Sequence, residues 1–448
     1  MQWKKLLNSD RLKRPKRKRP PELHLNPFFE DQDRIVFSQP FRRMQAKTQV
    51  HPLCDNDHVR TRLTHSSEVA TIGFVLGYGV GKDLKKHHRL GHISEYDFGL
   101  LVQAACLAHD IGNPPFGHAG EEAIRDWFIK NGDAKGIFSS DMTDAECNDF
   151  RKFEGNAQGF RILTQIENYK SNGGMQLTYS TLAAYMKYPW DSNIDPLNKG
   201  KFSYFQSEKK YAELVASNLG LIPQIKGGWC RHPLTYLVEA ADDICYAVID
   251  LEDGIEMGSY SIKEYINQFQ KYIDTNQRKK DYRSFNDDVQ RISFLRAKAI
   301  TRFVEQSIRA FINNEDKILK GEFNKELLDE IKEAEFVRKA KKLAYQKVFE
   351  HEKKLYLEVA AYPVISGLLE HYVNACIFKS GKSEDTKNRH LISLMGRMKP
   401  KSSDTRYEKL LKVTDFISGM TDRFAVGMYR QLQGITTGSL TPAPNVQK

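Results

Sequence analysis

Residues 98–118 of the chain read Phe98-Gly99-Leu100-Leu101-Val102-Gln103-Ala104-Ala105-Cys106-Leu107-Ala108-His109-Asp110-Ile111-Gly112-Asn113-Pro114-Pro115-Phe116-Gly117-His118. In the first half of this stretch, Phe98, Val102, Ala105 and His109 recur at the spacing of one helix face. His109 therefore ends an apolar stripe, and we expect it to point inward. The two prolines that follow fix the backbone and remove amide donors, so the helix must give way to a stiff loop.

The same helical periodicity recurs along most of the chain. Helical patterns cover about residues 35–133, 235–255, 286–379 and 409–432. In the second of these, Asp242, Tyr246 and Asp250 form a polar stripe beside the apolar one. Residues 173–200 are rich in Thr, Tyr, Pro and Asn, which predicts short strands or a long loop. We therefore predict an all-α fold with little or no β-structure.

The composition is that of a globular protein. The chain has 448 residues, of which 40% are hydrophobic and 28% are charged, so it can bury a substantial core. No apolar run approaches the roughly 18 to 20 residues of a membrane span, and the start resembles no signal peptide. The six cysteines form no CxxC pair, which argues against a zinc knuckle or a disulfide framework. These features predict a cytoplasmic protein.

Positive charge is in excess and is unevenly distributed. The 68 Lys and Arg residues against 57 Asp and Glu give a net charge of +11, which favours a polyanionic ligand such as a nucleotide or nucleic acid. The densest run is Arg11-Leu12-Lys13-Arg14-Pro15-Lys16-Arg17-Lys18-Arg19-Pro20-Pro21, where prolines and repulsion oppose regular structure. We predict that residues 1–30 form a flexible basic arm, which acts as a solubilising tail or contacts the phosphates of single-stranded DNA.

His109 and Asp110 are candidates for a metal site. An adjacent His and Asp at a helix end supply one neutral nitrogen and one hard oxygen to the same point. Imidazole with carboxylates suits Mn²⁺, Fe²⁺, Co²⁺, Ni²⁺ or Zn²⁺, and suits Mg²⁺ less well. Water and phosphate oxygens would take the open coordination positions. His65 and Asp242 are further candidates, although a single His or Asp on a helix is more often a structural residue.

Four longer motifs occur in order along the chain. They are Arg60-Thr61-Arg62-Leu63-Thr64-His65-Ser66, His109-Asp110-Ile111-Gly112-Asn113-Pro114-Pro115-Phe116-Gly117-His118-Ala119-Gly120-Glu121, Phe153-Glu154-Gly155-Asn156-Ala157-Gln158-Gly159 and Glu239-Ala240-Ala241-Asp242-Asp243-Ile244-Cys245-Tyr246. Together they resemble the bacterial dGTP triphosphohydrolases of the HD-domain superfamily. The resemblance extends from about Phe41 to Asp253. A weaker match follows at Ser418-Gly419-Met420-Thr421-Asp422-Arg423-Phe424.

This resemblance implies a fold and an activity. The fold would be a helical HD-domain core over residues 31–260, followed by a helical C-terminal region over residues 261–448 that completes the active site and the oligomer interface. The activity would be metal-dependent hydrolysis of a dNTP, with dGTP preferred, to the deoxynucleoside and inorganic tripolyphosphate. The expected metal is Mn²⁺ or Mg²⁺, with Fe²⁺, Co²⁺, Ni²⁺ and Zn²⁺ as further candidates. Relatives are oligomers, commonly hexamers, which implies a homo-oligomer here.

The resemblance also assigns roles to single residues. The positions that match the metal ligands are His65, His109, Asp110 and Asp242. His118 matches the catalytic histidine, and Glu121 matches its carboxylate partner. This assignment is chemically reasonable, because a histidinium can protonate the 5′ oxygen of the leaving nucleoside near neutral pH. A neighbouring carboxylate would raise the pKa of that histidine.

Six residues are candidates for substrate binding: Gln45, Arg62, Lys187, Tyr188, Tyr246 and Asp250. Tyr246 and Asp250 follow Asp242 by one and two helical turns, and the matching positions in the family face the deoxyribose. Arg62 and Lys187 are candidates for the triphosphate, because fixed cations bind phosphate oxygens. Tyr188 could stack or hydrogen-bond beside them. Gln45 matches a glutamine that contacts the sugar or base region in relatives.

Two other functions stay open at this point. One is an HD-type phosphodiesterase that acts on another nucleotide, an alarmone or a nucleic-acid end. Such enzymes share the metal ligands but lack the Asn-Pro-Pro-Phe-Gly-His-x-Gly-Glu loop that ends here at Glu121. The other is a nucleic-acid-binding regulatory protein with a decayed catalytic centre, against which the intact ligand positions argue.

Overall fold

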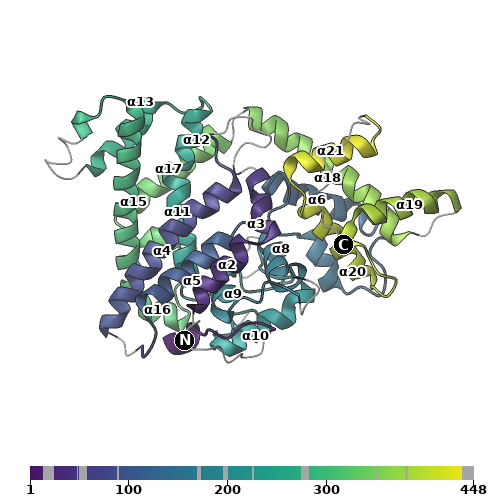
Figure 1. Cartoon of the computed structure of the whole chain (residues 1–448), viewed down its shortest axis with the longest axis horizontal. Helices are drawn as coiled ribbons and strands as arrows, with labels where there is room; N and C mark the ends of the chain where they lie inside the picture. Colours follow the sequence, from purple (N-terminus) through teal and green to yellow (C-terminus); the bar gives the residue numbers. More distant parts are fainter. Residues whose placement is uncertain are drawn as a thin grey trace.

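Helices build most of the described chain (Figure 1). The structure is a computed structural model that describes residues 1–13, 25–47, 49, 58–87, 90–168, 173–194, 200–224, 227–273, 282–349, 352–378 and 382–435. Within these residues the β-structure consists of two isolated bridges, Arg11 with Thr178 and Pro223 with Trp229. The predicted all-α fold is confirmed. None of the described helices has the length and apolar character that crossing a membrane requires.

The helices fall into two groups along the sequence. Those before residue 260 are α1 (Trp3–Leu6), α2 (Pro27–Val36), α3 (Gln39–Arg43), α4 (Arg62–His87), α5 (Glu95–Ala108), α6 (His118–Asn131), α7 (Asp144–Arg151), α8 (Gly155–Arg161), α9 (Tyr179–Tyr185), α10 (Lys209–Leu219), α11 (Thr235–Val248) and α12 (Asp250–Glu256). Those after it are α13 (Ile262–Phe269), α15 (Asp288–Asn313), α16 (Glu315–Lys320), α17 (Ala334–Ala344), α18 (Glu352–Ile377), α19 (Lys382–Leu394), α20 (Arg406–Ser418) and α21 (Asp422–Leu432).

The α4 and α5 pair is the centre of the first group. Ser94 and Asp97 form a capping box that starts α5. Gly77 lets α4 approach closely, since a Cβ there would lie 2.5 Å from the Phe98 carbonyl oxygen. α11 packs against both helices. The two ends that meet the candidate site, the start of α4 and the end of α5, are thus fixed relative to each other.

The buried apolar side chains form two clusters. The first spans α2, α4, α5, α9, α11, α15 and α17. The second spans α6, α7, α18, α20 and α21. The labels of α6, α18, α20 and α21 lie on the right in Figure 1. The loop from residue 109 to 117 joins them, because Ile111 belongs to the first cluster and Phe116 to the second. The first cluster runs on to Ala344, so the hydrophobic core does not divide at residue 260.

Three predicted segments differ in the structure. Residues 173–194, predicted as strands or loop, contain α9, which begins where the Thr178 hydroxyl accepts the Thr181 amide. The segment 235–255 is two helices that meet at Ile249. The segment 409–432 is also two helices, because Thr421 caps the start of α21.

The predicted basic arm is partly packed onto the body. Trp3 and Leu6 in α1 are buried, and Arg11 forms an ion pair with the buried Asp31. The Lys13 ammonium donates to the Thr164 carbonyl oxygen at 2.7 Å. Residues 1–13 and 25–30 are therefore not a flexible arm. The strongly basic run over residues 14–24 lies outside the described residues, and its role stays a prediction.

Candidate active site

Three side chains from three helices converge at the candidate site. His65 comes from the first turns of α4, His109 follows α5, and Asp242 lies on α11. The Asp242 Oδ1 atom is 3.1 Å from His65 Nε2 and 3.8 Å from His109 Nε2. One ligand atom from each residue lies within 4.8 Å of the other two. These three residues are therefore a group that can hold a metal ion.

The electrostatics of this group suit a cation. Burial by itself lowers the pKa of His65, but the Asp242 carboxylate outweighs burial and raises that pKa to about 9. Burial likewise disfavours the Asp242 charge, yet the two histidines hold the pKa of Asp242 below its ordinary value. A positive charge between these groups is thus stabilised, as a divalent-cation site requires.

The ring of His109 has a fixed orientation. Its Nδ1 atom lies 2.7 Å from the Cys106 carbonyl oxygen, which can only accept a hydrogen bond. Nδ1 therefore carries the proton, and Nε2 is left with a lone pair that faces Asp242. This is the tautomer that a metal-binding histidine needs.

Asp110, the fourth predicted ligand, faces a different partner. Its Oδ2 accepts from the Arg62 guanidinium at 2.5 Å, and its Oδ1 accepts from the Asn113 amide at 2.5 Å. Although burial opposes ionisation, the charge of Arg62 lowers the pKa of Asp110 to about 2. Asp110 Oδ1 is still only 3.7 Å from His109 Nε2. The carboxylate therefore borders the converging group, with Arg62 as its main partner.

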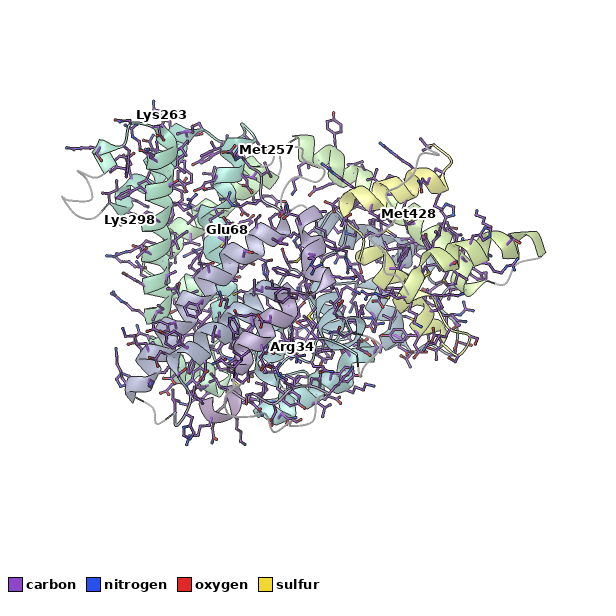
Figure 2. The ribbon with its side chains drawn as sticks, in the orientation of Figure 1. Arg34, Glu68, Met257, Lys263, Lys298 and Met428 are labelled. Carbon is purple, nitrogen blue, oxygen red and sulfur yellow. The ribbon has the colours of Figure 1, made fainter. Side chains whose placement is uncertain are left out.

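The start of α4 is tied to α12 by one arginine. The Arg60 guanidinium contacts Glu68 at 3.0 Å, Asp253 at 2.6 Å and Glu252 at 3.1 Å. Figure 2 labels Glu68 on α4, one turn beyond His65. This cluster fixes the helix end that carries His65. It also shows that the carboxylates after α11 are structural ion-pair partners.

The loop that follows the His-Asp pair is rigid. Lys47 is buried, and its ammonium donates to the carbonyl oxygens of Asn113 at 2.6 Å and Ser418 at 2.7 Å. The Phe116 amide donates to Asp422 at 3.0 Å. Phe116 itself has a φ of +64°, a strained conformation for a bulky residue that these contacts enforce. The C-terminal helices therefore hold the predicted catalytic loop in place.

His118 is the first residue of α6, and its side chain is exposed. The Glu121 carboxylate raises the pKa of His118, as predicted for a neighbouring carboxylate. Desolvation and the positive charges of Lys201 and Arg62 outweigh that effect, so the pKa is lowered below its ordinary value. Glu121 is buried, and its Oε1 accepts the Gly155 amide at 2.8 Å.

The predicted phosphate-binding residues are arranged in two places. Arg62 is buried beside Asp110, on the side of the loop that leads to His118. Lys187 lies 3.6 Å from the Glu239 carboxylate, and its ammonium is 5.8 Å from the centre of the Tyr188 ring. Electrostatic coupling to Asp242 connects Lys187 with the converging group.

The predicted sugar-binding residues differ in their exposure. Tyr246 is half-buried. Asp250 is fully buried, and burial raises the pKa of its carboxyl group to about 8. The Asp250 carboxyl group is thus closed off from solvent. Gln45 is exposed, and its Oε1 accepts from the Thr61 hydroxyl at 3.4 Å.

The structure adds residues that the sequence did not single out. Lys341 on α17 binds Asp243 at 2.5 Å, directly beside Asp242. Tyr345 interacts electrostatically with Tyr246, which places the end of α17 next to the α11 stripe. Lys201 binds Glu154 at 2.7 Å and lies 3.5 Å from Glu121. Lys341 and Lys201 are two of the 68 Lys and Arg residues in the chain, and Tyr345 is one of its 20 tyrosines. No local sequence pattern distinguishes these three residues.

Comparisons with known proteins agree with this arrangement. Residues 62–191 match the HD domain, and residues 329–431 match the phosphohydrolase-associated domain. A Pseudomonas aeruginosa deoxyguanosinetriphosphate triphosphohydrolase-like protein is 42% identical to this chain, over 98% of this chain and 100% of its own length. A Synechocystis sp. protein of the same name is 39% identical over 97% and 100%. The Klebsiella pneumoniae deoxyguanosinetriphosphate triphosphohydrolase is 32% identical over 91% and 94%.

Proposed function

The chain belongs to the HD-domain family of deoxyguanosinetriphosphate triphosphohydrolases and their like, and we propose that it hydrolyses a dNTP, preferably dGTP, to the deoxynucleoside and tripolyphosphate. One observation carries this proposal. The converging group of His65, His109 and Asp242 is joined, through one rigid loop, to His118 with Glu121 behind it. A metal at the converging group and a proton donor at His118 would thus be held at a fixed separation.

We assign the divalent metal, Mn²⁺ or Mg²⁺, to His65, His109, Asp242 and the neighbouring Asp110. The convergent lone pairs and the stabilised positive charge between them support this assignment. When bound, such an ion polarises a phosphate and lowers the pKa of a water molecule beside it. Asp110 accepts from Arg62 in this structure, so the same carboxylate connects the metal group to a cation that can bind phosphate.

His118 is proposed to supply the proton for the leaving group. Cleavage of the bond between the α-phosphorus and O5′ expels a nucleoside alkoxide, which leaves poorly unless it is protonated. The imidazolium of His118 would donate its proton to O5′, and Glu121 would stabilise the imidazolium. The negative triphosphate opposes the Lys201 and Arg62 charges that lower the pKa of His118. Substrate binding would therefore favour the protonated acid.

Substrate binding is proposed to use the charges and rings around this centre. Arg62 and Lys187 would contact the triphosphate, with Tyr188 beside Lys187. Tyr246 would pack against the deoxyribose and disfavour a 2′ hydroxyl. The burial of Asp250 supports a role through Tyr246 rather than an exposed contact. Gln45, which is exposed, would contact the sugar or the base. Residues 329–431, through Lys341 and Tyr345, would complete the pocket.

Association and location are also proposals. We propose a homo-oligomer, with a hexamer as the expected form, that uses the helices after residue 261. We propose that the basic run beyond Lys13 contacts single-stranded DNA, since its charge suits a phosphate backbone. A cytoplasmic location is supported by the free thiols of the described cysteines.

The metal assignment is tested by a matched pair of variants on one helix. Asp242→Asn removes a proposed ligand, whereas Asp243→Asn removes the neighbouring carboxylate that binds Lys341. We expect Asp242→Asn to weaken Mn²⁺ binding by more than about 100-fold, since even outer-sphere changes cost 10- to 100-fold. The Asp243→Asn variant should bind Mn²⁺ with the affinity of the wild-type protein. Calorimetric titration measures both, and equal affinity in the two variants would refute the assignment.

A further inference from the structure

We propose that Lys201 and Glu154 are positioning residues for the His118 and Glu121 pair, and that Lys201 keeps Glu121 ionised against the competing charge of Glu154. This inference rests on the proposed function, in which Glu121 acts as the carboxylate partner of His118. It adds two groups that the sequence motifs do not assign to the reaction. Neither group needs to touch the substrate to act in this way.

The two carboxylates lie close together in the protein interior. The side chains of Glu121 and Glu154 are each 1% exposed. They flank the start of α8, where Glu121 Oε1 accepts the Gly155 amide at 2.8 Å and Glu154 Oε1 accepts the Asn156 side-chain amide at 2.7 Å. A Cβ at residue 155 would lie 2.5 Å from Glu121 Oε1, so glycine at this position leaves room for the carboxylate.

Lys201 is the cation that both carboxylates share. Its ammonium is 2.7 Å from Glu154 Oε2 and 3.5 Å from Glu121 Oε2. The backbone of Lys201 is fixed, because its carbonyl oxygen accepts from the buried Trp190 indole at 2.7 Å. The next residue, Phe202, is buried in the second hydrophobic cluster. The lysine is therefore held over the two carboxylates from a rigid segment.

The charges do not balance around these groups. Four charged or titratable groups face Glu121: His118 and Arg125 on α6, Lys201, and Glu154. His118 faces Glu121 and Lys201, and also Arg62 and Asp110. Arg125 is more distant, at 3.9 Å from Glu121, and its guanidinium also donates to the Phe153 carbonyl oxygen. Two buried carboxylates beside one close cation favour one ionised and one protonated group.

The proton falls on Glu154. Burial, followed by the charge of Glu121, raises the pKa of Glu154 to about 7. Burial also acts to raise the pKa of Glu121. The positive charges of Lys201, His118 and Arg125 outweigh burial, so the pKa of Glu121 is lowered. Glu121 thus keeps the negative charge that acts on His118, while Glu154 takes up the excess proton. Without Lys201, Glu121 would lose the largest of the charges that lower its pKa and would become protonated at a higher pH.

Three variants separate this role from a direct contact with phosphate. Lys201→Met removes the cation, Glu154→Gln removes the competing charge but keeps the acceptor for Asn156, and the third variant combines both. At saturating Mn²⁺ and dGTP, we expect Lys201→Met to move the acidic limb of the kcat profile up by about one pH unit or more. Glu154→Gln alone should move it down, and the double variant should return toward the wild-type position. Lys201→Arg should keep the wild-type profile.

Two outcomes would overturn the inference. The first is an increase in KM for Lys201→Met with an unshifted pH profile, which would indicate a phosphate contact. The second is a double variant whose profile matches that of Lys201→Met, because the carboxylates would then not compete. Glu154→Gln is isosteric and tests the competition even where Lys201→Met fails to fold.

A measurement without turnover separates this inference from the proposed function. NMR titration of the His118 ring in ¹³C-histidine protein reports the local charge directly. The His118 pKa should be higher in the double variant than in the Glu154→Gln variant, because the double variant lacks the Lys201 charge that lowers this pKa. An unchanged titration would overturn the coupling. Absence of tripolyphosphate from wild-type protein with a normal titration would instead refute the proposed function alone.

Discussion

His118 is held at the first position of α6 by contacts from distant parts of the chain. The loop before it is fixed by Lys47 and by Asp422, and Glu121 supports it from one turn later. Its side chain stays exposed, so it is open to a ligand. A residue that is rigidly mounted, solvent-accessible and next to a buried carboxylate has the properties of a general acid.

Replacement of His118 tests this role. His118→Ala should lower kcat by about 10²- to 10⁴-fold, the usual contribution of general acid catalysis. It should leave Mn²⁺ binding unchanged, because His118 is not in the converging group of His65, His109 and Asp242. His87→Ala, at the exposed end of α4, is the matched control and should keep full activity. Steady-state rates measure the activity of both variants, and metal titrations measure their Mn²⁺ binding. Full activity of His118→Ala would rule out His118 as the acid.

At the residue scale, the structure brings together three of the residues that the sequence singled out, and the reason is clear. His65, His109 and Asp242 lie in long motifs, and the structure brings them together. The sequence did not predict that Asp110 binds Arg62, because an ion pair across 48 positions leaves no local pattern. It missed Lys201 for the same reason, since one lysine in a connecting segment looks like any surface cation.

At the element scale, α1 is an anchor rather than part of an arm. The Trp3 indole donates to Glu315 at 2.7 Å and its ring packs edge-on against Phe98. Behind α1, the buried His232 has its Nε2 3.0 Å from the Leu6 carbonyl oxygen, and its Nδ1 accepts the Leu234 amide at 3.1 Å. Sequence periodicity could not reveal this, because a four-residue helix shows too little of any pattern.

His232 predicts a loss of stability in acid. Burial lowers its pKa from 6.5 to about 4, so the folded protein favours the neutral ring. The resulting stability is complete above pH 6.5 and is lost as the pH falls toward 4, by about 2 kcal/mol at pH 5. His232→Gln keeps a donor and an acceptor but does not titrate. Urea unfolding should show a smaller loss between pH 7.5 and 5 in this variant, and equal losses would contradict the assignment.

The basic run requires a test that spares α1. Deletion of residues 1–21 would remove Trp3 and Leu6 from the core and confound folding with binding. Replacement of Arg14, Lys16, Arg17, Lys18 and Arg19 by glutamine removes five charges and leaves the packed residues in place. If all five contact phosphates, the salt slope of single-stranded DNA binding should fall by about 3.5, from about 0.7 per charge. An unchanged slope would eliminate the arm as a DNA contact.

At the scale of the whole molecule, the site lies where two hydrophobic clusters meet. The first cluster carries the converging group, and the second carries α6 with His118. The helical class followed from periodicity, since spacings of three and four residues recur through most of the chain. The contact between the two clusters did not follow from periodicity. Asp422 accepts from the Phe116 amide across 306 positions, and Ser418 reaches the loop only through Lys47, which donates to both Ser418 and Asn113.

The most direct test of the account is product analysis of dGTP turnover in ¹⁸O-labelled water with Mn²⁺. We expect deoxyguanosine without label and tripolyphosphate with one ¹⁸O, resolved by chromatography and mass spectrometry. That result would locate the attack at the α-phosphorus and the leaving group at O5′, as the metal group and His118 require. Formation of dGMP with pyrophosphate, or of labelled deoxyguanosine, by the folded and metal-loaded protein would contradict the account.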